Sequence, residues 1–143
     1  MRVVRRQSNI AKPVAGQLMS EPVVTADPGE TLTIAAQRMR AHRTGSLAVT
    51  VSGGVVGILT ERDILRAVCD QPDLASVPVS EYMTRSPQTV DAGDDAADAM
   101  LLMVRSGWRH LPVTIGGRLA GMLSARDLLG LEDWPRELLF EPW

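Results

Sequence analysis

The chain contains the stretch Gly57-Ile58-Leu59-Thr60-Glu61-Arg62-Asp63, and the same pattern returns 64 residues later as Gly121-Met122-Leu123-Ser124-Ala125-Arg126-Asp127. The same shift also superposes Met19 on Met83 and Asp27 on Asp91. No insertion is needed anywhere in the match. A repeat of this length in two copies predicts two similar units whose apolar faces cover each other, with a cleft between them.

Each copy has the residue pattern of a strand, a helix, two further strands and a second helix. In the first copy a helix from Leu32, with Thr31 as N-cap, follows the turn residues Asp27-Pro28-Gly29. A tight turn at Ser52-Gly53-Gly54 predicts a hairpin. The predicted elements of the first copy are strands at 23–25, 46–51 and 55–59, with a second helix at 60–68. Those of the second copy are strands at 88–90, 111–115 and 119–123 and helices at 95–106 and 125–131. Short helical turns are expected before each copy, at 14–19 and 79–83.

Composition narrows the class of protein. The 143 residues are 45% hydrophobic but only 3% aromatic, which predicts an aliphatic core of helices on sheets. A net charge of −2 without a basic stripe argues against nucleic acid as a partner. The single Cys69 and two histidines offer no ligand set for a metal. No apolar stretch approaches a membrane span, so we expect a soluble, cytoplasmic protein with no membrane partner.

The two ends of the chain differ from the repeats. Residues 1–11 are locally basic and predict a flexible arm, with an electrostatic tether as the alternative. Residues 132–143 form an aromatic tail, which covers either this chain's own core or a second subunit or partner. Between them we place a first unit at 12–70 and a second unit at 71–131.

The pairs Thr60-x-x-Asp63 and Ser124-x-x-Asp127 stand at predicted helix starts. On its own, such a pair is a capping box, in which the two side chains satisfy backbone N–H groups. Here a glycine and an aliphatic strand precede it twice. A helix N-terminus at the end of a sheet attracts phosphate, and a carboxylate there accepts hydrogen bonds from a ribose diol. The pairs therefore fit both a structural cap and a nucleotide site.

Both copies resemble CBS domains, the cystathionine β-synthase type, and together they resemble a Bateman module over about residues 12–131. The resemblance rests on Met19-Ser20-x-Pro22 and Met83-Thr84, on Asp27-Pro28-x-x-Thr31-Leu32, on Arg109-His110-Leu111-Pro112-Val113 and on the two stretches quoted first. It implies an α/β (α+β) fold with two β-α-β-β-α units in a pseudo-twofold arrangement. It also implies a homodimer and adenosine-containing ligands: AMP, ADP, ATP or S-adenosylmethionine.

The resemblance also implies roles for individual residues. Asp63 and Asp127 would hold ribose hydroxyls, and Thr60 and Ser124 would contact the ribose or the 5′ phosphate. An adenine slot would be lined by Val24, Thr25, Thr89 and Val90.

Phosphate recognition is expected to differ between the copies. The resemblance gives Arg109 to phosphate, with His110 beside it as a ligand or as a strand residue whose ring is satisfied. The first copy has Gly45-Ser46 at these positions, so its cleft would borrow Arg109 and the two sites would be unequal. Arg62 and Arg126 either guide phosphate or are solvated.

We therefore expect a stand-alone regulatory module that senses an adenine nucleotide and signals to a separate effector protein. The alternative is a dimerisation or scaffold module that binds no nucleotide. No Ser or Cys has an evident base partner, so no enzymatic activity and no cofactor are expected. A third possibility is that the arm or the tail docks onto a partner protein.

Overall fold

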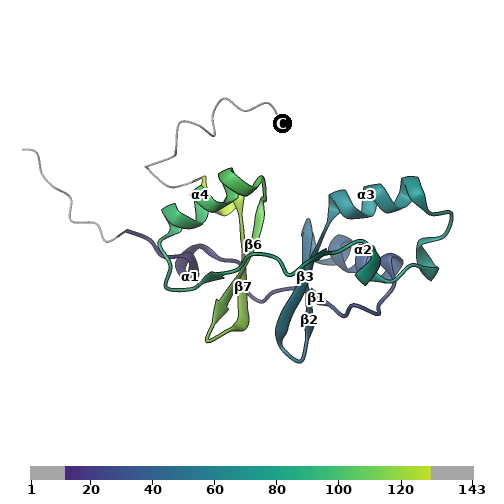
Figure 1. The fold of residues 1–143 in the computed structure, drawn as a ribbon, viewed down its shortest axis with the longest axis horizontal. Coiled ribbons are helices and arrows are strands. Elements are labelled where there is room, and N and C mark those ends of the chain that lie inside the picture. Colours follow the sequence, from purple (N-terminus) through teal and green to yellow (C-terminus); the bar gives the residue numbers. More distant parts are fainter. Residues whose placement is uncertain (1–11, 130–143) are drawn as a thin grey trace, which may run out of the picture.

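The computed structural model describes residues 12–129, so the predicted arm at 1–11 and the tail at 132–143 lie outside the described residues. Two units lie side by side, with their sheets in the middle and their helices on the outside (Figure 1). One sheet has four strands in the order β1-β2-β3-β4, and the other has three in the order β5-β6-β7. This is the mixed α/β architecture that the sequence predicts.

In chain order the first elements are α1 (Ala15–Leu18), β1 (Thr25–Ala26), α2 (Leu32–His42), β2 (Ser46–Val51), β3 (Gly54–Thr60), α3 (Glu61–Asp70) and the 3-10 turns η1 (Leu74–Ser76) and η2 (Val79–Glu81). The remaining elements are β4 (Thr84–Arg85), β5 (Val90–Asp91), α4 (Ala96–Ser106), β6 (His110–Ile115), β7 (Arg118–Ser124) and the 3-10 turn η3 (Ala125–Leu128).

Local chemistry sets the ends of these elements. Thr31 accepts a hydrogen bond from the Ile34 amide at the start of α2, as predicted, and Asp95 accepts one from the Ala97 amide at the start of α4. Both hairpin turns place two consecutive residues at positive φ, Ser52-Gly53 in one and Gly116-Gly117 in the other. Such turns match the twist of the paired strands.

Several predicted boundaries need correction. The first strand of each unit begins two residues later than predicted, at Thr25 and at Val90, because pairing with β2 and β6 starts only there. The predicted last helix at 125–131 is a 3-10 turn that ends at Leu128. The strand β4 was not predicted, and it exists only because it pairs with Gly57 and Ile58 of β3.

The segments that lead into the two units are exchanged. The leading segment of the first copy packs with the core of the second, through Ala15, Leu18 and Met19. The leading segment of the second copy packs with the core of the first, through Val77, Val79 and Tyr82. Backbone hydrogen bonds fix both contacts: Ala96 donates to Pro13 at 3.0 Å, and Val79 donates to Glu30 at 2.8 Å. Each unit is therefore completed by residues from the other copy.

This exchange explains the repeated methionines and glycines. Met83 lies over Gly57, and Met19 lies over Gly121, so closely that a Cβ on either glycine would collide with the methionine side chain. The glycines that open the repeated stretch are therefore required by close packing.

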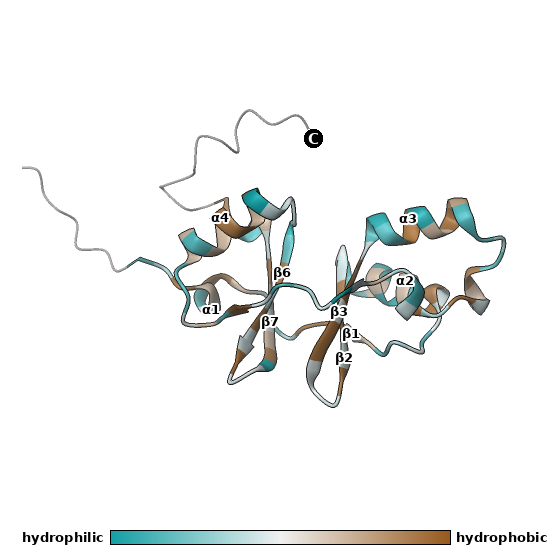
Figure 2. Ribbon diagram, in the orientation of Figure 1, coloured by the Kyte–Doolittle hydropathy of each residue, from teal (hydrophilic) through white to brown (hydrophobic). Residues whose placement is uncertain are grey.

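A small apolar seam joins the two units. Ala48, Ile58 and Met122 are buried there, and Val23 and Leu119 pack against them. The strands that face the seam carry many hydrophobic residues, whereas the outer helices alternate in hydropathy (Figure 2). The seam uses different residues from the cores of the two units.

Candidate functional site

The pair Thr60 and Asp63 forms a complete cap at the start of α3. The Thr60 amide donates to Asp63 Oδ2 at 2.9 Å, and the Thr60 hydroxyl lies 3.2 Å from the same oxygen. Asp63 is only 8% exposed, and its Oδ1 lies 3.5 Å from the Arg66 guanidinium. The capping interpretation of this pair is therefore correct, and a ligand role would be added to it.

The pair Ser124 and Asp127 repeats this geometry in the second unit. The Ser124 amide donates to Asp127 Oδ2 at 2.8 Å, and the Asp127 amide donates to the Ser124 hydroxyl at 3.3 Å. The turn that follows, η3, has only four residues. The second cap therefore lacks the long helix that stands behind the first.

Two linkers, at 20–25 and 84–89, each pair at their start with a strand of the opposite copy. Ser20 pairs with Met122, two residues before Ser124, and Thr84 pairs with Ile58, two residues before Thr60. The segment at 20–25 therefore begins beside the strand that leads to the Ser124 motif and ends on the first unit's β2, where Thr25 pairs with Ala48. The segment at 84–89 begins beside the strand that leads to the Thr60 motif.

The four residues predicted to line an adenine slot differ in their surroundings. Thr25 pairs with Ala48 in the sheet, and the Val24 carbonyl accepts a hydrogen bond from the Ala48 amide at 3.3 Å. Thr89 is exposed. Val90 is 6% exposed and belongs to the second core, so its side chain packs inside the unit.

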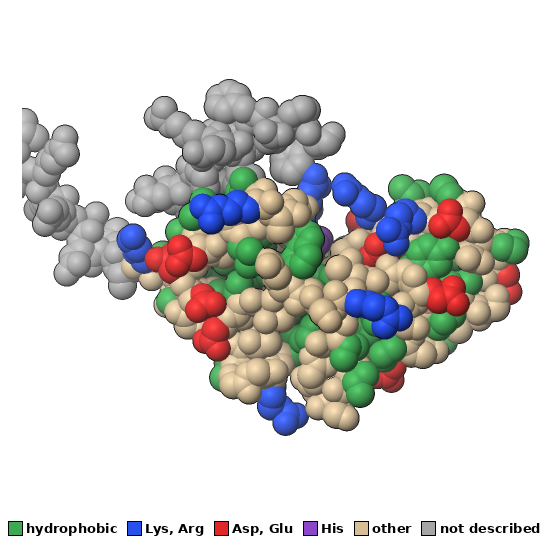
Figure 3. All heavy atoms as spheres, viewed as in Figure 1, with side chains coloured by type: hydrophobic (Ala, Val, Ile, Leu, Met, Phe, Trp, Pro, Cys, Tyr) green, Lys and Arg blue, Asp and Glu red, His purple; other side chains and the backbone are tan. Residues whose placement is uncertain are grey.

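Charged groups of both units meet near the strand ends. Burial lowers the pKa of His110 below its ordinary 6.5, and Arg109 lowers it further, while Glu61 of the first unit and Asp127 act in the opposite direction. Glu61 occupies the place opposite Gly45, where a Cβ would come within 3.3 Å of its carboxyl carbon. In one view, Lys and Arg side chains gather along the upper rim where the units meet (Figure 3).

Glu61 was missed in the sequence analysis. The repeat contained a signal for it: the two copies differ in charge here. Glu61 aligns with Ala125, and Gly45, which lies opposite Glu61, aligns with Arg109. At this pair of neighbouring positions the first unit therefore has a glycine and an acid, whereas the second has a base and an alanine.

The remaining charged candidates are either exposed or engaged in capping. Arg62 and Arg126 are exposed in the first turns of α3 and η3. The cluster of aspartates at the start of α4 is occupied by capping, since Asp95 caps the helix and Asp94 accepts from the Asp91 amide at 2.9 Å.

Among the described residues no three His, Cys, Asp or Glu side chains gather to hold a metal ion. No described helix is long and apolar enough to cross a membrane.

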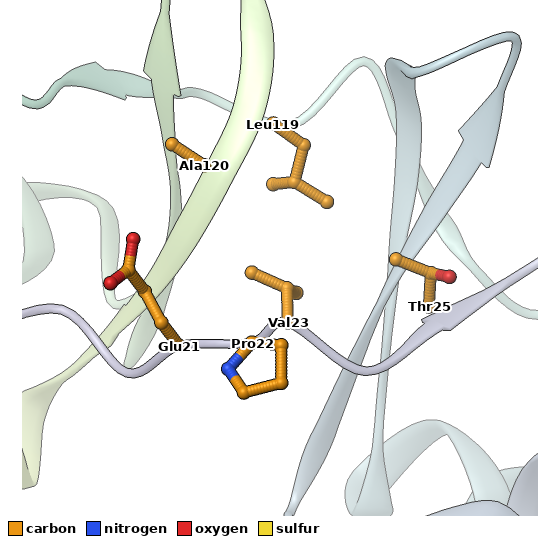
Figure 4. Close-up of a pocket in the computed structure, with 6 residues that line it drawn as sticks. All are labelled: Glu21, Pro22, Val23, Thr25, Leu119 and Ala120. Atoms are coloured by element: carbon orange, nitrogen blue, oxygen red, sulfur yellow. The ribbon is translucent and has the colours of Figure 1, made fainter.

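Two pockets lie beside the linker of the first copy. The first, of about 590 Å³, lies between the linker and β7 (Figure 4) and is lined by Glu21, Pro22, Val23, Thr25, Leu119 and Ala120. The second, of about 530 Å³, runs along β1 and includes Val24 and Thr25 together with Asp27, Glu30, Arg38 and His42. Neither pocket is lined by the cap motifs, so they adjoin those motifs without including them.

An ion pair forms one wall of the second pocket. Arg38 lies 2.6 Å from Glu30 and donates to the Thr25 carbonyl at 2.7 Å. Its hydrogen bonds lower the pKa of Glu30. The charge of the guanidinium is thereby balanced by the Glu30 carboxylate, and the Arg38 side chain connects α2 to β1.

Comparison with known proteins gives a consistent result. Residues 15–70 and 79–132 each match the family model described as CBS domain. The chain is 40% identical to an uncharacterized 17.7 kDa protein of Acidianus ambivalens, over 78% of this chain and 68% of that protein. It is 31% identical to the uncharacterized protein MJ1225 of Methanocaldococcus jannaschii, over 82% of this chain but only 43% of that longer protein.

A solved structure with the same fold contains a nucleotide. The CBS domain protein PAE2072 from Pyrobaculum aerophilum, complexed with AMP, superposes with a TM-score of 0.77 at 32% identity. The match covers 88% of this chain and 95% of that one.

Proposed function

Because this chain belongs to the CBS-domain family, we propose that it is a regulatory module that binds an adenosine-containing nucleotide between its units. Nucleotide binding changes the arrangement of the two copies, and a separate effector protein responds to that change. The observation that carries the proposal is the pairing of each copy's linker with the strand that leads to the other copy's capped aspartate. The AMP complex of a protein 32% identical to this one supports it.

In the proposed sites each residue of the cap motifs has its own contact with the nucleotide. Asp63 and Asp127 use Oδ2 for their caps, so Oδ1 is the oxygen assigned to a ribose hydroxyl. In the first unit this requires Arg66 to yield its contact with Asp63. Thr60 and Ser124 contact the ribose or the 5′ phosphate.

The remaining candidates complete the two proposed sites. Arg109, with His110 beside it, receives phosphate, and Arg62 and Arg126 guide it. Val24, Thr25 and Thr89 line the base, while Val90 supports the slot from the core. A nucleotide held this way touches both copies, so it shifts their arrangement by its differential affinity for the two states.

The test is isothermal titration of AMP, ADP, ATP and S-adenosylmethionine into the wild type and into Asp63→Asn and Asp127→Asn. Asparagine keeps an oxygen for the cap but removes the charge. We expect a loss of about 1–3 kcal/mol of binding, roughly 5- to 150-fold, in the variant whose cleft is used. Asp95→Asn, which alters a cap outside the clefts, should bind like the wild type.

A scaffold module that binds no nucleotide is the second candidate. The exposed apolar side chains of Leu65 and Val68 on α3, at 65% and 57%, favour an assembly role. We also propose that the protein acts as a homodimer in the cytoplasm, with units at 12–70 and 71–131. Silence from all four ligands in a folded protein, together with a mass of twice 15.5 kDa by sedimentation, would favour the scaffold.

A further inference from the structure

We propose that the 590 Å³ pocket between the units is a separate site for a small organic cation, a flat apolar ring that carries one ammonium group. The pocket shares Thr25 with the proposed base slot and differs from the nucleotide site in its other lining residues, so it goes beyond the nucleotide role and does not depend on it. The volume lies within the range of small-molecule sites, about 300–1,000 Å³. Both copies contribute walls, the linker from one and β7 from the other.

Pro22 opens this pocket. At the equivalent place in the other copy the Ser86 amide donates to the Val56 carbonyl at 3.1 Å, which continues the pairing of the linker with β3. Pro22 has no N–H to donate. Pairing of its linker with β7 ends at Ser20, which leaves a gap beside Ala120.

The lining favours a ring with a positive end. Val23 and Leu119 point toward one another across the pocket, with Glu21 and Thr25 on opposite sides (Figure 4). Two aliphatic side chains offer a surface for a flat ring, and the carboxylate of Glu21 attracts an ammonium group. The equivalent of Glu21 in the other copy is Arg85, so the matching surface there would repel a cation.

A bound ring would act on the seam. Val23 and Leu119 also pack against the seam residues Ile58 and Met122. The Leu119 amide lies 3.5 Å from the Gly53 carbonyl across the hairpin tips. A ligand wedged between them contacts both units at once and would bias their relative placement.

The test uses three probes that share an indole ring and differ in charge: tryptamine, indole and indole-3-acetate. Each is titrated into ¹⁵N-labelled full-length protein and followed by amide chemical shifts. We expect saturable shifts at Val23, Leu119 and Ala120, with affinity in the order tryptamine, indole, indole-3-acetate. An absence of saturation, shifts confined to other residues, or a reversed order would overturn the proposal.

Variants locate the site and its charge. Glu21→Gln should weaken tryptamine roughly two- to fivefold, as expected for a solvated charge pair, and leave indole unchanged. Its matched control is Arg85→Gln, which should leave both unchanged. Ala120→Phe fills the pocket and should weaken tryptamine at least tenfold, whereas Ala41→Phe, on exposed helix surface, should not.

Two further results bear on the proposal. Equal tryptamine affinity in Glu21→Gln and wild type would contradict the role of the carboxylate, and this variant serves even if Ala120→Phe misfolds. Displacement of tryptamine by saturating AMP would show that the pocket is part of the nucleotide site, which overturns its separateness. Tryptamine binding that AMP leaves unchanged supports two sites, and it does so whether or not AMP itself binds.

Discussion

In the first unit, Arg38 on α2 bonds both Glu30 and the Thr25 carbonyl, and this ion pair holds the helix against the edge strand. In the second unit the equivalents of these residues are Leu102 and Asp94, and Leu102 packs against the apolar core instead. The backbone path is shared, while the chemistry that fastens the helix differs.

The same divergence appears near the cap motifs. Gly45 and Glu61 in the first unit stand where Arg109 and Ala125 stand in the second. The caps themselves are alike, with amide-to-carboxylate distances of 2.9 and 2.8 Å. The two copies thus share the groups that cap the backbone and differ in the charges around the caps.

The largest expected effect comes from truncating equivalent core leucines. Leu47→Ala and Leu111→Ala each remove a side chain with 0% exposure. Each should lower the free energy of unfolding by about 3–5 kcal/mol. Because the units exchange segments, we expect one urea transition in both variants, followed by circular dichroism. Two separate transitions, with only one shifted in each variant, would show that the units fold independently.

A smaller loss is expected where methionines lie on glycines. Gly57→Ala and Gly121→Ala should each cost about 1–3 kcal/mol, because the new methyl group must displace Met83 or Met19. Thermal unfolding measures the loss. Gly29→Ala, where no atom lies within 4 Å of a new Cβ, is the control.

A double variant isolates this contact. Met83→Ala combined with Gly57→Ala should cost less than the sum of the two single changes. Strict additivity would mean that the methionine is not what the glycine accommodates.

Replacing Arg38 by leucine imitates the second unit within the first. Arg38→Leu should destabilise the protein by about 1 kcal/mol at pH 7, because the pair is partly exposed. The pKa of Glu30 is lowered in the folded protein, so its ionised carboxylate stabilises the fold at pH values above its ordinary pKa of 4.5. This stabilisation is lost as the pH falls through the lower pKa of the folded state.

Urea unfolding at a series of pH values measures this effect. The difference between Arg38→Leu and wild type should therefore shrink below pH 4.5. Arg40→Leu, which changes an exposed arginine on the same helix, is the control. A difference that stays constant down to pH 3 would contradict the ion-pair explanation.

The smallest expected effect concerns His110. Its folded pKa is lowered, so below pH 6.5 the unfolded chain binds a proton that the folded chain resists. Stability contributed at neutral pH is lost as the pH falls from 6.5 toward the folded value. His110→Gln should flatten this part of the pH profile, and His42→Gln should not. If the free energy of unfolding falls with pH equally steeply in wild type and His110→Gln, His110 is not the group responsible.

Much of the fold follows from local sequence signals. The helix start after Thr31 and the four hairpin strands were predicted within one residue, because caps, glycine turns and alternating apolar residues act over a few positions. The family resemblance is confirmed by both matching segments. The strand β4 and the exchanged leading segments were not predicted, since no local pattern encodes contacts across half the chain.

The candidate site divides along the same line. The hydroxyl–carboxylate pairs were predicted from spacing, and the structure shows both as caps. Their ligand roles stay predictions. The approach of Glu61 to His110 depends on how the units meet, which a sequence read one copy at a time does not reveal.

The exchange of leading segments makes this repeat inseparable. A polypeptide holding one copy would carry a leading segment with no core of its own to cover and a core without its cover. It could complete itself only by trading segments with a second such polypeptide. An ancestral single-copy protein would therefore have been an intertwined pair, and fusion of the two genes would have made that pairing permanent without requiring any new contact.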